Sequence, residues 1–197
     1  MANPTPPAHH PPVQRVLLIG PGGAGKSTLA REIGTARALP VIHLDALYWR
    51  DGWVPTPDEA WEVIVRALVA RPAWVLDGNF GGTLPLRLAA CDTVIYLDQS
   101  PWRCTARVVR RWVTYRGRSR PDMAPGCPER PSAEFLRWIW RYRATRRPRV
   151  LAALAAARAN GKTVHVLRSP RDVRGFLASL GSHAPPDGNA LAHARDS

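Results

Sequence analysis

A glycine-rich run near the N-terminus carries the clearest chemistry in the chain. Residues 20–27 read GPGGAGKS and match the pattern G-x-x-x-x-G-K-[ST] at every fixed position, between the apolar run RVLLIG and a segment with helical spacing. The glycines let backbone N–H groups converge on phosphate oxygens, and the start of a helix adds positive potential. We therefore predict a nucleotide-phosphate site formed by Gly20, Gly22, Gly23, Ala24, Gly25, Lys26, Ser27 and Thr28.

The same motif predicts the cofactors. Lys26 is expected to reach the β and γ phosphates and the Ser27 hydroxyl to ligate Mg²⁺, so ATP and Mg²⁺ are the expected pair. The chain carries neither an NKxD guanine signature nor a DxxG switch in the right place, which favours ATP over GTP. With 197 residues it lacks the bulk of a ring-forming motor ATPase, and a small kinase remains.

Two carboxylates follow neighbouring apolar runs. HLDALYW places Asp45 after one run, and WVLDGNF places Asp77 after the next. Ligands of an open parallel sheet lie beyond the carboxyl ends of its strands, so both side chains should face the phosphate site. Asp77 would then hold the Mg²⁺ shell, and Asp45 would accept a proton from an attacking hydroxyl. The alternative for either is that it caps a turn. His43 is expected to be a satisfied core residue.

The elements that must position these residues alternate as in an α/β protein with a parallel sheet. Apolar runs predict five strands, and amphipathic stretches predict helices between them. Two long helical segments, 101–115 and 132–159, separate the last two strands. The five expected strands cover residues 15–20, 40–45, 72–78, 92–98 and 162–168.

An arginine-rich interval, RGRSRPDMAPGCPERP, separates the two long helical segments. Its glycines and prolines predict a mobile loop, which we expect to form a lid over about residues 116–131. Phosphoryl transfer builds negative charge on the moving group, and an arginine brought in by a closing loop can stabilise that charge. We expect Arg118, Arg120 and Arg130 to act in this way, the alternative for each being a solvated surface charge.

The acceptor side of the site depends on the loops that follow Asp45 and Asp77. Trp49 and Trp53 flank the Asp-Gly pair of LYWRDGW in the loop after Asp45, and they could sandwich a planar acceptor or form a small cluster under a loop. Trp49 and Asn79 are therefore candidate substrate-binding residues. Arg168, after the fifth run, would stack on adenine or lie on the surface at the start of a helix.

Composition limits the remaining possibilities. The chain is 45% hydrophobic, which suits one domain over residues 13–180, between a proline-rich leader (1–12) and a small, polar tail (181–197) that are both expected to be disordered. No apolar run is long enough for a membrane helix. Three cysteines at unmatched spacings indicate a reducing, cytoplasmic setting. The net charge of +13 suits a phosphate enzyme, a nucleic-acid binder or a codon preference for arginine.

Several blocks together resemble a known family. HLDALYWRDGWVP, WVLDGNF, LPLRLAACDTVIYLD, and GRSRPDMAPGCPER followed by EFLRWIWRYR, look like the adenylate kinase-like P-loop proteins often labelled topology modulation proteins. The resemblance runs from about Val16 to Leu180. It implies a P-loop nucleoside/nucleotide-kinase fold with the strand order 2-3-1-4-5, and implies little about the substrate.

The resemblance also bears on the acceptor. In the adenylate kinases that this family more distantly resembles, the third strand ends in DGFPR, whose arginine grips the acceptor phosphate. Here the tract is DGNFGGTLPLR, in which only Arg87 could substitute. An Asp at the end of strand two instead looks like kinases of this fold that phosphorylate a hydroxyl group.

Three functions follow. We favour a kinase acting on a hydroxyl of a nucleoside-like or sugar-like small molecule. A nucleoside monophosphate kinase and a nucleotide-dependent DNA-binding regulator are the alternatives.

Overall fold

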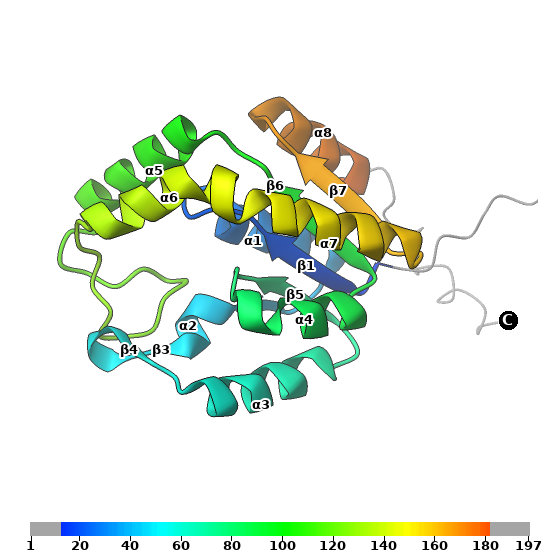
Figure 1. The fold of residues 1–197 in the computed structure, drawn as a ribbon, viewed down its shortest axis with the longest axis horizontal. Helices are drawn as coiled ribbons and strands as arrows, with labels where there is room; N and C mark the ends of the chain where they lie inside the picture. The colour runs from blue at the N-terminus through cyan, green and yellow to red at the C-terminus, as the bar shows by residue number, and fades with distance from the viewer. Residues whose placement is uncertain (1–12, 182–197) are drawn as a thin grey trace, which may run out of the picture.

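A five-stranded parallel sheet forms the centre of the computed structural model, which describes residues 13–181 (Figure 1). The strand order is β2-β5-β1-β6-β7, which is the predicted order 2-3-1-4-5 for the five expected strands. The α/β fold class is therefore confirmed. The predicted leader and tail lie outside the described residues. The strands are β1 (Arg15–Ile19), β2 (Val41–His43), β5 (Trp74–Asp77), β6 (Thr93–Leu97) and β7 (Thr163–Leu167).

Helices connect these strands and cover both faces of the sheet. They are α1 (Lys26–Arg37), α2 (Leu44–Tyr48), α3 (Asp58–Val69), α4 (Leu84–Ala90), α5 (Pro101–Thr114), α6 (Ala133–Thr145), α7 (Arg147–Ala159) and α8 (Pro170–Gly181), with single 3₁₀ turns at Asp51–Trp53 and Gly81–Thr83.

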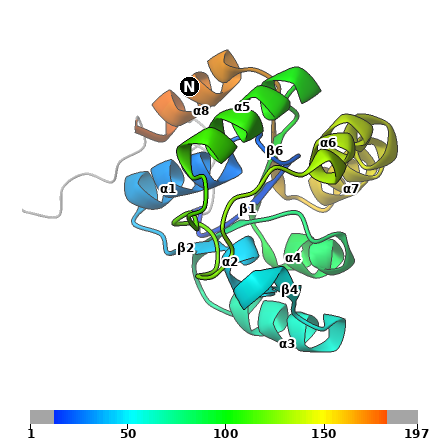
Figure 2. The same cartoon turned by 90° about the vertical axis from the view of Figure 1, so that its left-hand side faces the viewer.

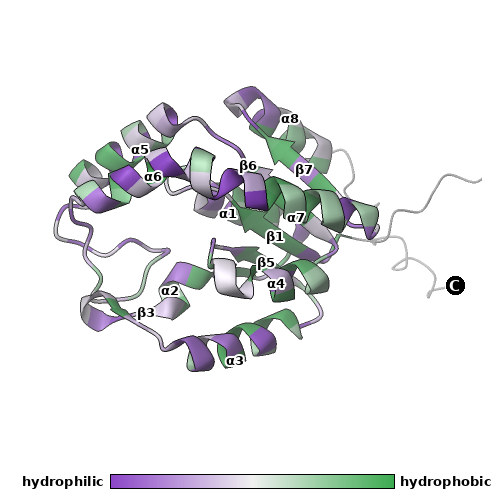
Figure 3. Ribbon diagram, viewed as in Figure 1, coloured by the Kyte–Doolittle hydropathy of each residue, from purple (hydrophilic) through white to green (hydrophobic). Residues whose placement is uncertain are grey.

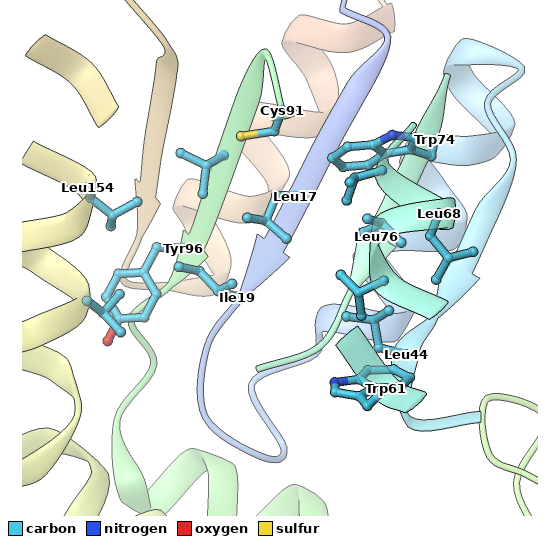
Figure 4. Close-up of a cluster of buried hydrophobic side chains, with 14 of the residues drawn as sticks. Leu17, Ile19, Leu44, Trp61, Leu68, Trp74, Leu76, Cys91, Tyr96 and Leu154 are labelled. Atoms are coloured by element: carbon cyan, nitrogen blue, oxygen red, sulfur yellow. The ribbon is translucent and has the colours of Figure 1, made fainter. Parts of the chain in front are cut away.

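Alternation along β1 divides the core into two layers. Leu17 and Ile19 pack with α3, α4 and α7, whereas Val16 and Leu18 pack with α1, α5 and α8. Strands buried on both faces read as continuous apolar runs, which is why RVLLI carries no polar alternation. Figure 2 shows the two groups of helices on opposite sides of the sheet, and Figure 3 shows β1 coloured largely hydrophobic. Figure 4 shows the first layer, in which Trp74 and Tyr96 flank Leu17.

The parallel register brings the carboxyl ends of three strands together. Asp77, the last residue of β5, pairs with His43 of β2 on one side and with Leu18 of β1 on the other. Glycines then lead the chain from β1 into α1. The phosphate loop and both predicted aspartates therefore lie at one edge of the sheet.

Two features depart from the expected elements. The long segment predicted as one helix over 132–159 is two helices, because the backbone breaks at Arg146 and Pro148 lies in the first turn of α7. A short antiparallel hairpin of β3 (Trp49–Arg50) and β4 (Val54–Pro55) follows α2 and was not predicted. The loop between α5 and α6 reaches across to this hairpin (Figure 1).

Candidate active site

A cleft of about 860 Å³ opens where the strand ends, the phosphate loop and the lid meet. Four residues predicted for the site lie outside its wall: Gly20, Arg87, Arg118 and Arg168. The predicted residues in the wall are Gly22, Gly23, Ala24, Gly25, Lys26, Ser27, Thr28, Asp45, Trp49, Asp77, Asn79, Arg120 and Arg130.

The phosphate loop is wrapped tightly between β1 and α1. Gly23 has a φ of 76°, and a Cβ there would collide with the Cys104 carbonyl oxygen, so α5 packs directly on the loop and only glycine fits. The Lys26 Nζ donates to the carbonyls of Gly20 at 2.9 Å and Pro21 at 3.1 Å. The ammonium group thus lies over the loop whose N–H groups would face a phosphate.

Asp77 and Asp45 reach the cleft from neighbouring elements. Asp77 ends β5, is only 4% exposed, and its Oδ2 lies 2.8 Å from the His43 Nδ1. His43 is therefore satisfied, as predicted, but its partner is a cleft carboxylate. Asp45 lies in the first turn of α2 and not at the end of a strand, because β2 stops at His43.

The electrostatics of Asp45 place it among the other charged groups of the cleft. Burial raises the pKa of its carboxyl group above the ordinary value. The charge of Lys26 opposes this rise, Asp77 adds to it, Arg120 opposes it, and Asp122 adds to it. A carboxylate with a raised pKa is a stronger proton acceptor than an exposed one, which suits a general base.

Asn79 ties the loop after β5 to the phosphate loop. Its Oδ1 accepts a hydrogen bond of 3.0 Å from the backbone N–H of Gly20. Gly20 therefore contributes no N–H group to the cleft, which corrects its assignment as a phosphate-binding residue. The Asn79 side chain still lines the cleft beside Asp77.

Arg87 is not a substrate-binding residue in this structure, which corrects the prediction. Its side chain is fully buried on α4, at 0% exposure. The guanidinium group donates to the backbone carbonyls of Gly78 (2.8 Å), Asn79 (2.7 Å), Phe80 (2.6 Å) and Thr83 (3.3 Å). Arg87 thus holds the loop that carries Asn79, and no guanidinium donor is directed to the cleft.

The lid places its arginines differently from one another. Arg120 is largely buried in the cleft wall, and Arg130 lies in the wall over the Trp53 ring, 5.9 Å from its centroid. Arg118 is exposed outside the cleft, which corrects its assignment. Arg107 of α5, which the sequence places near the lid but which was not among the arginines expected to act, also lines the cleft, and its Nη1 donates to the Ala24 carbonyl at 2.8 Å.

Two acidic residues of the lid were also missed. Asp122 pairs with Arg120 at 3.0 Å and bonds to the Ser27 side chain, which draws its pKa below the ordinary value against the effect of burial. Glu129 contacts both Arg120 and Arg111. The signal that could have found them is plain: they are the only carboxylates between residues 116 and 131.

The lid packs on the β3–β4 hairpin through a small apolar cluster. Trp49 and Trp53 contact each other edge to face, with centroids 5.6 Å apart, so they do not sandwich a planar molecule between them. Both still line the cleft. The lid residues packed against them are Met123, Ala124 and Cys127.

Hydrogen bonds complete this lid–hairpin contact. The Gly52 N–H donates to the Gly126 carbonyl at 3.0 Å, and the Trp53 Nε1 donates to the Pro128 carbonyl at 3.2 Å. Gly126 has a φ of 74°, and a Cβ there would collide with the Asp51 side chain. The turn therefore needs glycine for its backbone and for the close approach.

Arg168 lies outside the cleft, which corrects its expected place beside adenine. Its side chain is 65% exposed and its Nε is 3.8 Å from Asp98. The cleft wall at this end comes instead from α8, including Pro170, Val173 and Arg174.

The oxygen donors at the phosphate loop fit a nucleotide-bound Mg²⁺. The Ser27 hydroxyl and the Asp77 carboxylate both line the cleft, and oxygen is the ligand that this ion prefers. Among residues 13–181, no three acidic, His or Cys side chains gather closely enough to hold a metal by themselves. Mg²⁺ in phosphoryl-transfer sites rests on one or two carboxylates, waters and substrate phosphates, so a complete protein cage is not required.

Comparison with solved structures identifies a similar fold. A shikimate kinase from Acinetobacter baumannii in complex with shikimate is 16% identical, with 85% of this chain and 90% of that chain covered and a TM-score of 0.50. At this identity the likeness shows the fold alone. No family model and no curated protein matches the chain, so the resemblance to topology modulation proteins stays an expectation. No helix within residues 13–181 is both long and apolar enough to cross a membrane.

Proposed function

We propose that this protein transfers the γ-phosphoryl group of ATP to a hydroxyl group of a small, uncharged acceptor. The observation that carries the proposal is the position of Asp45. Its carboxyl group lies in the cleft within electrostatic reach of Lys26 on the phosphate side and Arg120 on the lid side. A proton acceptor placed between a phosphate site and a lid arginine is the arrangement that hydroxyl phosphorylation needs.

The donor side would hold ATP through the phosphate loop. Backbone N–H groups of residues 22–27 and the Lys26 ammonium would bind the β and γ phosphates. Ser27 and Asp77 would hold Mg²⁺ directly or through its bound waters, and this ion would neutralise phosphate charge when bound. His43 fixes the Asp77 side chain through its Nδ1, and Arg120 would stabilise the charge that develops on the phosphoryl group.

The acceptor side favours a hydroxyl over a phosphate. Arg87, which could have gripped an acceptor phosphate, is committed to four backbone carbonyls. Arg120 is balanced by Asp122 and Glu129. An acceptor beside Asp45 would therefore meet a carboxylate and the aromatic wall of Trp49, which suits a neutral, ring-containing molecule.

One observation supports a nucleoside monophosphate acceptor as the second candidate. Arg130 lines the cleft, and its guanidinium group lies over the Trp53 ring and pairs with no carboxylate among the described residues. Its guanidinium could hold an acceptor phosphate. Neither the cleft nor the structural comparison supports the DNA-binding alternative.

The test is a phosphoryl-transfer assay with Mg²⁺-ATP and a pooled panel of nucleosides, nucleoside monophosphates and small hydroxylated metabolites, read by mass. Lys26→Ala is the control for the phosphate site. A phosphorylated product that is absent with Lys26→Ala, and reduced about 10²-fold or more with Asp45→Asn, supports hydroxyl transfer. Transfer that survives Asp45→Asn but fails with Arg130→Ala would favour the monophosphate kinase. Formation of ADP with no phosphorylated product would overturn both.

A further inference from the structure

One lid carboxylate lies between two cleft arginines. The Glu129 side chain is only 3% exposed, and its Oε1 lies 3.0 Å from the Arg111 Nε and in contact with the Arg120 Nε. Arg111 comes from α5 and Arg120 from the lid, and both line the cleft. A single oxygen therefore holds together two cations from different segments.

The two guanidinium groups are close enough to influence each other. Burial lowers the pKa of Arg111, and the charge of Arg120 lowers it further, while Glu129 opposes both effects. Two neighbouring cations in a partly buried wall repel each other, so they stay together only with a negative charge between them. Glu129 supplies that charge.

The backbone of the lid fixes where this carboxylate lies. The Glu129 N–H donates to the Arg118 carbonyl at 3.0 Å, and Arg116 and Glu129 form a β-bridge. Arg120 makes its second ion pair with Asp122, whose side chain bonds to Ser27 of the phosphate loop. Backbone contacts of the lid thus hold the Glu129 residue in place, and Asp122 links Arg120 to Ser27 of the phosphate loop.

We propose that Glu129 is a positioning residue that holds Arg111 and Arg120 side by side as one two-pronged site for the phosphoryl group in transit. Its charge also keeps the pair from binding free anions tightly, so that the arginines act on the greater charge of the transition state. The inference rests on the proposed function, because it assigns the cleft to phosphoryl transfer.

A purely structural role for Glu129 makes a different prediction. If the carboxylate only stabilised the lid, its removal would loosen the lid and weaken the binding of every anion. If the Glu129 charge instead balances the pair of Arg111 and Arg120, glutamine at this position leaves two cations with less negative charge between them. The pair should then bind an inorganic anion more tightly. Affinity for sulfate therefore separates the two roles.

The experiment compares Glu129→Gln and Glu129→Asp with the wild type, and uses Glu134→Gln, an exposed glutamate on α6 outside the cleft wall, as the matched control. Sulfate binding is measured by calorimetry without nucleotide, and kcat and KM for ATP are measured with the acceptor found by the panel assay. We expect Glu129→Gln to bind sulfate about tenfold more tightly. We also expect its kcat to fall about 10²-fold with little change in KM, because the arginines lose their alignment.

A double variant distinguishes sulfate bound at the phosphate loop from sulfate bound at Arg111 and Arg120. The extra sulfate affinity of Glu129→Gln should disappear when Arg111→Ala is added, whereas sulfate bound by the phosphate loop should remain. Equal sulfate affinity in Glu129→Gln and the wild type, or a gain that survives Arg111→Ala, overturns the proposal.

The Asp variant keeps the test decisive if Glu129→Gln does not fold. It retains the charge but is shorter by one methylene, so we expect sulfate affinity close to that of the wild type and a reduced kcat. Unchanged kcat or sharply tighter sulfate binding in this variant also overturns the proposal. If the wild type transfers no phosphoryl group, the proposed function fails, while the sulfate titrations still decide the role of Glu129.

Discussion

Replacing Arg87 tests whether a buried guanidinium group supports the site from within the fold. Arg87→Met keeps most of the side-chain length but removes every donor. Hydrogen bonds from a charged donor contribute about 1.5–3 kcal/mol each, and four backbone carbonyls share this donor. Burial of the charge works against these hydrogen bonds, since it lowers the pKa of Arg87 from its ordinary value to about 10, a shift that corresponds to about 3 kcal/mol.

The hydrogen bonds of Arg87 contribute more to stability than the burial of its charge costs, so the wild type should be more stable than Arg87→Met. The carbonyls of Asn79 and Phe80 lie in a partly exposed stretch and can regain water, whereas those of Gly78 and Thr83 are buried. We therefore expect Arg87→Met to lose about 3–5 kcal/mol of unfolding free energy, which is near the lower end of the hydrogen-bond contribution after the cost of burying the charge is subtracted. For a chain of this size that is a fall in Tm of about 6–20 °C.

Urea unfolding followed by far-UV circular dichroism measures the loss, with an unchanged m-value as the check on two-state behaviour. Arg66→Met is the control, because Arg66 is 63% exposed and forms a surface ion pair with Glu62 on α3; such pairs contribute about 0–1 kcal/mol. A loss below about 1 kcal/mol in Arg87→Met, together with a higher KM for the acceptor, would refute the reasoning and return Arg87 to substrate binding.

Three further predictions concern the cleft. Asp45→Asn should lower kcat about 10²-fold or more and yet unfold at a higher temperature near pH 7. The reason is that the pKa of Asp45 is raised in the folded state, so its ionised form destabilises the fold. In thermal scans over a pH series, this gain in Tm should shrink as the pH falls towards 3.8. Gly126→Ala should displace the lid from the hairpin, seen as faster proteolysis between residues 116 and 131 and a kcat about tenfold lower, and Asp51→Gly should partly restore both; equal cleavage rates in variant and wild type would count against the collision. Arg168→Ala should change KM for ATP less than about twofold, whereas Arg120→Ala should lower kcat about 10³-fold; the opposite ranking in steady-state assays would return Arg168 to the nucleotide site.

The phosphate loop and the strands of the sheet could be predicted from the sequence because they require particular residue types at fixed spacing. Gly23 has to be glycine where α5 meets the phosphate loop, and Lys26 has to follow the last glycine of the motif. Apolar runs such as RVLLI identified the strands, since a strand buried on both faces has no polar alternation. The strand order came from the family resemblance and matches the sheet.

The roles of individual arginines could not be predicted in the same way. Arg118 and Arg120 are two residues apart in one loop, yet only Arg120 of the two lines the cleft, where Asp122 and Glu129 pair with it, while the Arg118 carbonyl accepts a hydrogen bond from the Glu129 N–H. Arg87 has donors that suit a phosphate and a set of carbonyls equally well. Which of these it meets depends on how α4 packs under the loop after β5, a tertiary contact without a local sequence signal.

The contact between the lid and the hairpin of residues 49–55 has an evolutionary consequence. Both segments stand outside the five-stranded sheet, and both contribute to the cleft wall. Selection for a new acceptor can therefore act on them while the phosphate loop and the core stay unchanged. Because Gly126 lies directly against Asp51, and the Gly52 N–H bonds to the Gly126 carbonyl, a change in one segment demands a compensating change in the other. We expect descendants of this chain with different acceptors to carry paired substitutions across this contact.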